Sequence, residues 1–142
     1  HHIPYLYAWT SQPWKTQFWT REIIDRMYRN DINGLGGNDD CGQMSAWYIL
    51  NSMGFYQVCP GKPVYSIGRP LFEEVTINLP DRKTFVIRTH NNSKTNKYIE
   101  SVLLNGKPLD VPFFTHDDLV RGGTMEITMS PVPTEWGKQV KN

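Results

Sequence analysis

The sequence has 142 residues, of which 39% are hydrophobic and 20% charged, and its formal net charge at pH 7 is +1. This composition is typical of a folded globular domain and excludes an intrinsically disordered segment. The 15 Lys and Arg residues form no basic run, which argues against nucleic-acid binding. No apolar segment approaches the ~20 residues that a membrane-spanning helix needs.

The chain begins with His1-His2 and has no initial Met, so we interpret it as a fragment or a processed product. His1-His2 are either the end of a purification tag or native residues that line a pocket. Cys41 and Cys59 form no CxxC pair and no metal spacing, and we expect two free, mostly buried thiols.

The first part of the chain is helical in pattern. Residues 1–12 are aromatic and apolar and predict a short helix, and Pro13 suits the first turn of the next helix, predicted to end at about residue 29. Six residues in this helix recur at helical spacing and predict its buried stripe, while the charged residues among them predict a solvated face. The stripe consists of Thr16, Trp19, Thr20, Ile23, Ile24 and Met27.

A loop and a second helix follow. Residues 30–37 include three glycines, which allow positive φ and the close approach of a ligand. The next helix is predicted from about Cys41 to Met53, with Gly54 as its terminator. Its apolar residues lie on most sides, so we expect it to be buried nearly all round.

After residues 55–68, predicted to be irregular, the hydrophobic period changes to two. The alternation predicts strands at residues 74–79, 84–88, 98–104 and 125–129. Asn105-Gly106 predicts a tight hairpin, and residues 115–120 predict a capped helical turn. The fold class is therefore α+β, with helices in residues 1–60 and an antiparallel, strand-rich part in residues 61–142.

Two adjacent carboxylates, Asp39 and Asp40, stand at the start of the second helix. Together with Asn38 they are candidate helix caps, because their side chains can accept the free N–H groups of the first turn. The alternative is a general base, since a carboxylate in a turn bordered by Gly36 and Gly37 can activate a water beside a closely bound substrate.

Other chemistry has less support in the sequence. The four histidines show no metal-binding spacing, and Ser45 and Cys41 have no recognisable base partner. His116 beside Asp117-Asp118 is explained by helix capping. The glycine-rich loop has neither GxGxxG nor Walker spacing.

The residues also resemble a known family. His1 to Tyr7, Gln12 to Gln17, Gly34 to Tyr48 and Gly54 to Gly61 are similar to the C-terminal part of family 92 glycoside hydrolases, as are several shorter runs further on. These are calcium-dependent exo-acting α-mannosidases, chiefly α-1,2, found mostly in bacteria. The resemblance covers essentially all of the chain and implies that His1-His2 are native.

The resemblance implies a fold and a mechanism. The helices would be the last ones of an (α/α)6 barrel, and the strands part of a C-terminal β-sandwich. By motif match Asp40 is the general base of an inverting reaction, Asp39 a supporting cap, and Asn38 a motif position of doubtful role. Adjacent carboxylates cannot be the acid and base, which are ~6.5–9.5 Å apart in inverting enzymes.

The same resemblance gives the remaining predictions. His2, Trp14, Gly36 and Gly37 are predicted to bind substrate, an α-mannoside glycan. The general acid and the main calcium ligands are expected outside this chain, and no metal ligand is named within it. The parent would be periplasmic, cell-surface or secreted in a bacterium, and the isolated chain inactive. The alternatives are a carbohydrate-binding module, in which Trp136 stacks on sugar, and a purely structural module.

Overall fold

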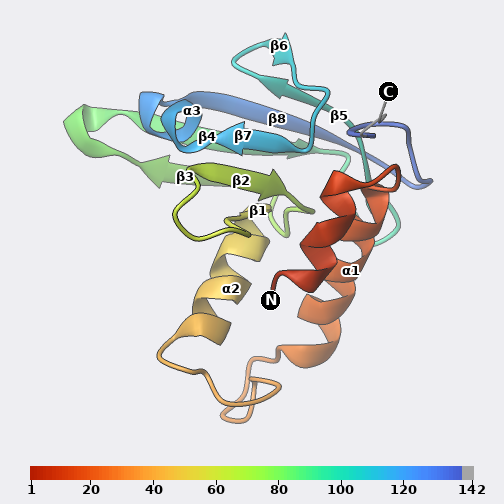
Figure 1. Cartoon of the computed structure of the whole chain (residues 1–142), viewed down its shortest axis with the longest axis vertical. Coiled ribbons are helices and arrows are strands. Elements are labelled where there is room, and N and C mark those ends of the chain that lie inside the picture. The colour runs from red at the N-terminus through yellow and green to blue at the C-terminus, as the bar shows by residue number, and fades with distance from the viewer. Residues whose placement is uncertain (139–142) are drawn as a thin grey trace.

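The computed structural model describes residues 1–138 and places the helices against one side of two β-sheets (Figure 1). A 3-10 helix, η1 (Ile3–Trp9), packs along α1 (Trp14–Met27), and α2 (Gln43–Met53) follows after a long loop. Residues 139–142 of the predicted strand-rich part lie outside the described residues. No helix within residues 1–138 is long and apolar enough to cross a membrane.

The buried face of α1 differs from the predicted stripe. The buried residues are Thr16, Gln17, Thr20 and Ile24, whereas Trp19 and Met27, both predicted to be buried, are 44% and 46% exposed. The prediction is confirmed for Thr16, Thr20 and Ile24 and wrong for Trp19 and Met27, because the buried face is largely polar. Gln17 carries its carbonyl to a strand, and its Oε1 accepts the backbone N–H of Ile99 at 2.7 Å.

The helix α2 is not buried nearly all round, contrary to the prediction. Within this chain it buries Trp47, Asn51 and Ser52, and Ile49 is 57% exposed. The helix is therefore covered only in part, and β1 (Phe55–Tyr56), which follows it in the chain, is one of the elements that it contacts. Gly54 ends it as predicted, with φ of 101° and a backbone N–H bonded to Leu50 and Asn51.

The strands form two sheets. The smaller sheet has the order β1-β2-β7, with β2 at Val64–Ile67 and β7 at Phe113–Thr115. The prediction that residues 55–68 are irregular was therefore wrong in part, because β1 and β2 lie within them. These strands are too short to show an alternation in the sequence, and their pairing is long-range.

The larger sheet has the order β3-β4-β8-β5-β6. Its strands span Glu74–Asn78, Thr84–His90, Gly123–Ser130, Tyr98–Leu104 and Lys107–Pro108 in that order. The prediction of an antiparallel sheet was wrong at one position, because β4 and β8 pair in parallel. Parallel neighbours need a long crossover, and residues 91–122 supply it here.

Local signals in the strand-rich part are confirmed. Asn105 and Gly106 have φ of 50° and 76° in the turn between β5 and β6. Thr115 and Asp118 form a capping box at the start of α3 (His116–Arg121), as the predicted helical turn requires. The short 3-10 helix η2 (Pro80–Arg82) connects β3 and β4.

One hydrophobic cluster joins the two sheets. It contains Phe55, Ile67 and Phe114 from the smaller sheet and, from the larger, residues such as Phe85 and Ile127, which are fully buried. The burial of apolar side chains in such a cluster is the main favourable contribution to the folding of a domain. The helices and the sheets share contacts, and the division between residues 60 and 61 stays a prediction.

Candidate active site

The turn before α2 is built from three consecutive residues in the left-handed region. Asp40, Cys41 and Gly42 have φ of 48°, 60° and 87°. For residues with a Cβ this conformation costs roughly 1–2 kcal/mol each, and such strain is concentrated at functional sites. The two neighbouring carboxylates, Asp39 and Asp40, have different surroundings.

Asp39 caps α2 from outside the helix. Its Oδ1 accepts the backbone N–H of Ser45 at 2.9 Å, and its Oδ2 accepts the Ser45 hydroxyl at 2.7 Å. The side-chain hydrogen bond from Ser45, reinforced by the backbone N–H of the same residue, lowers the pKa of the Asp39 carboxyl. Among the three candidate caps it is therefore Asp39 whose carboxylate binds the first turn, although Gly42 occupies the N-cap position.

Asp40 is exposed, and its carboxylate makes no hydrogen bond or ion pair within residues 1–138. Its backbone carbonyl accepts the N–H of Gln43 at 3.3 Å, which anchors the main chain while the side chain stays open. A carboxylate in this state can accept a proton from a nearby water.

The N-terminus reaches the same end of α2. The His1 ring lies 2.9 Å from Nε2 of Gln43 and 3.1 Å from the Met44 sulfur, and the indole N–H of Trp47 donates to the His1 carbonyl at 3.0 Å. Of the histidine pair it is thus His1 that docks beside the turn. Its contact with Gln43 was not predicted, since 42 positions separate the two residues in the chain.

A hollow of about 500 Å³ opens beside Asp39 and Ser45. Tyr28 and Tyr48 stack at its wall with ring centroids 5.0 Å apart, and the Tyr28 hydroxyl donates to the Met44 carbonyl at 3.2 Å. No feature of the sequence indicates this pair. The lining residues are Tyr28, Arg29, Asn30, Gly34, Leu35, Ser45, Tyr48 and Ile49.

The loop glycines do not use the positive φ that the sequence analysis considered, and the substrate-binding role of Gly36 and Gly37 stays a prediction. None of Gly34, Gly36 and Gly37 has positive φ. A Cβ on Gly34 would lie 1.9 Å from the Arg29 carbonyl oxygen, so that glycine is needed for a close turn. Gly36 and Gly37 are exposed, and a Cβ on Gly37 would meet nothing within 4 Å.

The other predicted substrate-binding residues lie in two places. His2 is exposed next to His1, near the turn. Trp14 starts α1 at the end away from the loop that leads to Asp40, and it packs edge-on against Tyr98 at 5.9 Å. The structure does not bring Trp14 and Asp40 together. Asn38 is exposed in the loop ahead of the turn.

Three further predictions concern metal, thiols and sugar stacking. Within residues 1–138 no group of three His, Cys, Asp or Glu side chains could hold a metal ion. Cys41 and Cys59 are free, as predicted, but exposed, because both lie in loops or turns. Trp136 is only 8% exposed and donates to the Leu109 carbonyl at 2.7 Å, so it offers no stacking face to a sugar.

The family can be assigned from a comparison with known sequences. The sequence model of the glycosyl hydrolase family 92 catalytic domain matches residues 1–131. The chain belongs to this family. The match begins at residue 1, so His1 and His2 lie within the family domain.

Solved structures agree with this assignment. A family 92 α-mannosidase from Bacteroides thetaiotaomicron, in complex with mannoimidazole, is 41% identical and covers 98% of this chain with a TM-score of 0.92. A family 92 inverting mannosidase from the same organism is 45% identical over 97% of this chain, with a TM-score of 0.91. An uncharacterized secreted glycosidase from Arthroderma benhamiae is 33% identical over 94% of this chain.

The chain corresponds to a small part of each relative. It spans 18% of the Arthroderma glycosidase and 18% and 19% of the two Bacteroides enzymes. The α+β arrangement of this family 92 chain therefore corresponds to one part of each of these larger relatives.

Proposed function

We propose that this chain is part of an inverting α-mannosidase that removes terminal mannose, mainly α-1,2-linked, from glycans. Membership of family 92 and the likeness to two mannosidases support the substrate class. In this proposal η1, α1 and α2 complete an (α/α)6 barrel, and the two sheets belong to a β-sandwich.

In the proposed reaction Asp40 is the general base. Its carboxylate removes a proton from a water whose oxygen attacks the anomeric carbon, while an acid on the opposite side of the sugar protonates the departing oxygen. The observation that carries this role is the contrast between the two neighbours: Asp39 is engaged by Ser45 and Asp40 is exposed and unpaired within residues 1–138.

The experiment compares Asp40→Asn and Asp39→Asn in the full-length enzyme. We expect Asp40→Asn to lower kcat by about 10²–10⁴-fold, the usual contribution of general-base catalysis. Its melting temperature should stay unchanged, because Asn tolerates the left-handed conformation and no partner is lost. Asp39→Asn should lower the melting temperature and retain most of the activity.

Activity of Asp40→Asn within about tenfold of the wild type would show that another group activates the water. Equal losses of activity in both variants would also contradict the proposal, because they would assign the two carboxylates the same importance.

The acid and the calcium ligands are proposed to lie elsewhere in the parent enzyme. Within residues 1–138 no group of three His, Cys, Asp or Glu side chains could hold a metal ion, which supports ligands from other segments. Full-length enzyme treated with EDTA should lose activity and regain it with calcium, whereas the 142-residue chain should show no turnover of mannosides. Secretion to the periplasm or cell surface of a bacterium is part of the same proposal.

A further inference from the structure

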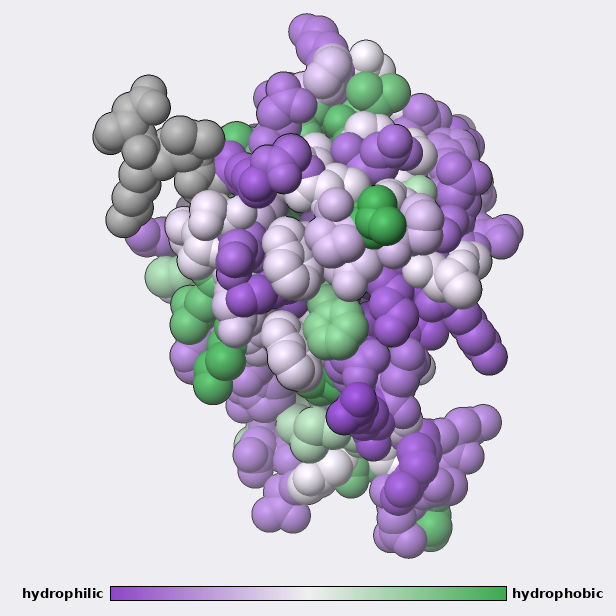
Figure 2. All heavy atoms as spheres, turned by 90° about the vertical axis from the view of Figure 1, so that its right-hand side faces the viewer, coloured by the Kyte–Doolittle hydropathy of each residue, from purple (hydrophilic) through white to green (hydrophobic). Residues whose placement is uncertain are grey.

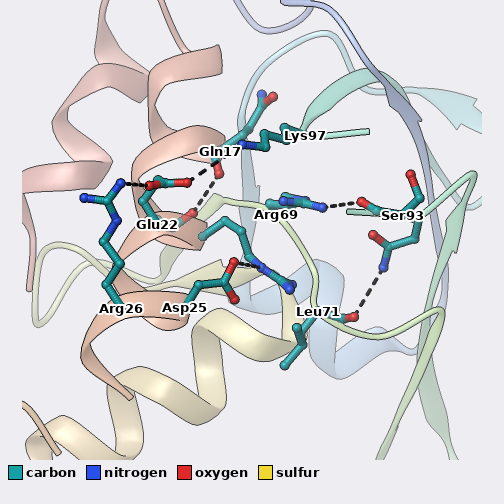
Figure 3. A network of polar contacts seen from close by, with 11 residues as sticks. Gln17, Glu22, Asp25, Arg26, Arg69, Leu71, Ser93 and Lys97 are labelled. Carbon is teal, nitrogen blue, oxygen red and sulfur yellow. Dashed lines mark hydrogen bonds and ion pairs between the residues drawn. The ribbon is translucent and has the colours of Figure 1, made fainter. Parts of the chain in front are cut away.

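A second polar cavity, distinct from the turn around Asp40, lies between α1 and the loop that precedes β5 (Figure 3). Its volume is about 310 Å³. The wall combines side chains from three separate parts of the chain. The lining residues are Phe18, Arg21, Glu22, Asp25, Arg69, Lys94 and Lys97.

Arg69 is the unusual member of this wall. The residue is only 3% exposed, its Nη2 donates to the Ser93 carbonyl at 2.6 Å, and its Nε is enclosed without a hydrogen-bond partner. Buried guanidinium groups are normally paired with a carboxylate, because an unpaired charge in the interior is costly. No carboxylate within residues 1–138 lies within 4 Å of the Arg69 guanidinium.

The carboxylates in the wall are already engaged by other cations. Asp25 pairs with Arg21 at 2.9 Å, and Glu22 pairs with Arg26 at 2.6 Å and with Lys97 at 3.8 Å. Lys94, like Arg69, has no ion-pair partner within residues 1–138. Four cations therefore line the cavity against two carboxylates, which leaves a positive excess.

Electrostatics support the same reading of Arg69. Burial, together with repulsion by Arg21, lowers the pKa of the Arg69 guanidinium to about 10, although Asp25 acts in the opposite direction. The group remains charged at neutral pH, with its charge incompletely balanced. Of its three nitrogens, only Nη2 makes a hydrogen bond within residues 1–138, and Nε is enclosed without a partner.

The lysine-bearing loop is held in place. The Asn92 side chain donates to the carbonyls of Leu71 and Phe72, and Asn96 donates to the Asn91 carbonyl at 2.8 Å. Ser93 accepts the backbone N–H of Asn96 at 3.1 Å. These contacts fix the main chain that carries Lys94 and Lys97, so only the lysine side chains have to be ordered when a ligand binds.

We propose that this cavity binds a small tetrahedral oxyanion, namely phosphate or a phosphate monoester. Arg69 would bind it through a guanidinium N–H that has no hydrogen-bond partner within residues 1–138, with Lys94 as the second cation. Guanidinium groups suit oxyanions because their N–H donors match the oxygen positions. A bound anion would also connect α1 to the segments before β3 and β5. The side of the molecule drawn in Figure 2 is mostly hydrophilic, with a few apolar patches.

The test measures the binding of inorganic phosphate to the full-length enzyme by calorimetry, with chloride at the same ionic strength as the reference. We expect one phosphate per chain. Lys94→Gln and Arg69→Gln should each weaken binding about tenfold or more, the loss of one charge-assisted contact. Lys83→Gln, which changes an exposed lysine outside the cavity, is the matched control and should bind as the wild type does.

Glycerol 1-phosphate distinguishes the sources of the anion. Binding as tight as that of phosphate indicates a monoester, and a loss of binding indicates the free anion; both support an oxyanion site. Equal responses to phosphate and chloride, or unchanged binding in both cavity variants, would overturn the proposal. So would a full-length enzyme in which a carboxylate from another segment occupies the cavity and no phosphate binds. Lys94 is exposed, so its variant decides the matter even if Arg69→Gln fails to fold.

Discussion

The hydrogen bond between Tyr5 and Asn51 connects the N-terminal helix η1 to α2, and its removal tests how the site is supported. The Tyr5 hydroxyl donates to Oδ1 of Asn51 at 2.5 Å, and the Asn51 amide in turn donates to the Trp47 carbonyl at 2.8 Å. Tyr5 is 0% and Asn51 1% exposed, so water cannot replace a lost partner. Burial raises the pKa of the Tyr5 phenol well above its usual value, which keeps the group a donor.

In Tyr5→Phe the ring and its stacking on Tyr56 remain, and only the hydroxyl is removed. The Asn51 carbonyl is then buried without a donor, which costs about 1–3 kcal/mol. For urea unfolding of the 142-residue chain, this corresponds to a fall in midpoint of roughly 0.5–1.5 M. The combined fluorescence of the five tryptophans, of which Trp47 and Trp136 are buried, provides the signal.

Two further variants control the measurement. Tyr7→Phe removes a hydroxyl that makes no hydrogen bond within residues 1–138, and it should change stability by less than about 0.5 kcal/mol. Asn51→Leu combined with Tyr5→Phe replaces both partners by apolar groups, so the double variant should lose less than the sum of the single ones. Additive losses, or a Tyr5→Phe variant as stable as the wild type, would refute the reasoning.

Two other predictions concern the turn and its loop. Asp39 has a lowered pKa in the folded state, so its contribution to stability is present above its unfolded pKa and is lost as the pH falls through the folded value. In a carbon-detected NMR titration, Ser45→Ala should raise the pKa of Asp39, while the pKa of Asp118, held low by Thr115, should stay constant. An unchanged pKa of Asp39 would contradict the capping role. Gly34→Ala should lower the free energy of unfolding by at least about 1–3 kcal/mol, because the new Cβ would lie 1.9 Å from the Arg29 carbonyl oxygen. In the control, Gly37→Ala, the new Cβ meets no atom within 4 Å and should be tolerated. Equal stability of the two variants in urea would disprove the need for glycine at position 34.

The parts of the fold that the sequence predicted well are those with local signals. The strand 98–104 was predicted at the bounds that β5 has, and the alternation of β3, β4 and β8 was visible because each strand buries one face. The Asn105-Gly106 hairpin and the box of Thr115 and Asp118 follow from turn and cap chemistry within a few residues. Such signals do not depend on the rest of the chain.

Long-range pairing was not predictable in the same way. The strands β1, β2 and β7 are two to four residues long, and β7 joins a sheet with strands some fifty positions earlier. The buried face of α1 was misjudged because Gln17 is buried for one hydrogen bond to Ile99, which no periodicity of apolar residues can indicate. Met27 and Trp19 are apolar but face outward in this chain.

The candidate site shows the same division. The motif located the turn, and Asp39 and Asp40 were both predicted as candidates, but composition alone cannot say which carboxylate is engaged. The local conformation is just as hidden, because Asp40, Cys41 and Gly42 are all left-handed although only one of them is glycine. Nothing in the sequence indicates that Asp40 and Cys41 share the conformation of Gly42. The turn places Asp39 where Ser45 can bind it and leaves Asp40 exposed. The hydrogen bonds from Ser45 are thus the physical reason to assign capping to Asp39. The exposed carboxylate of Asp40, which has no partner within residues 1–138, is the reason to propose proton transfer for it.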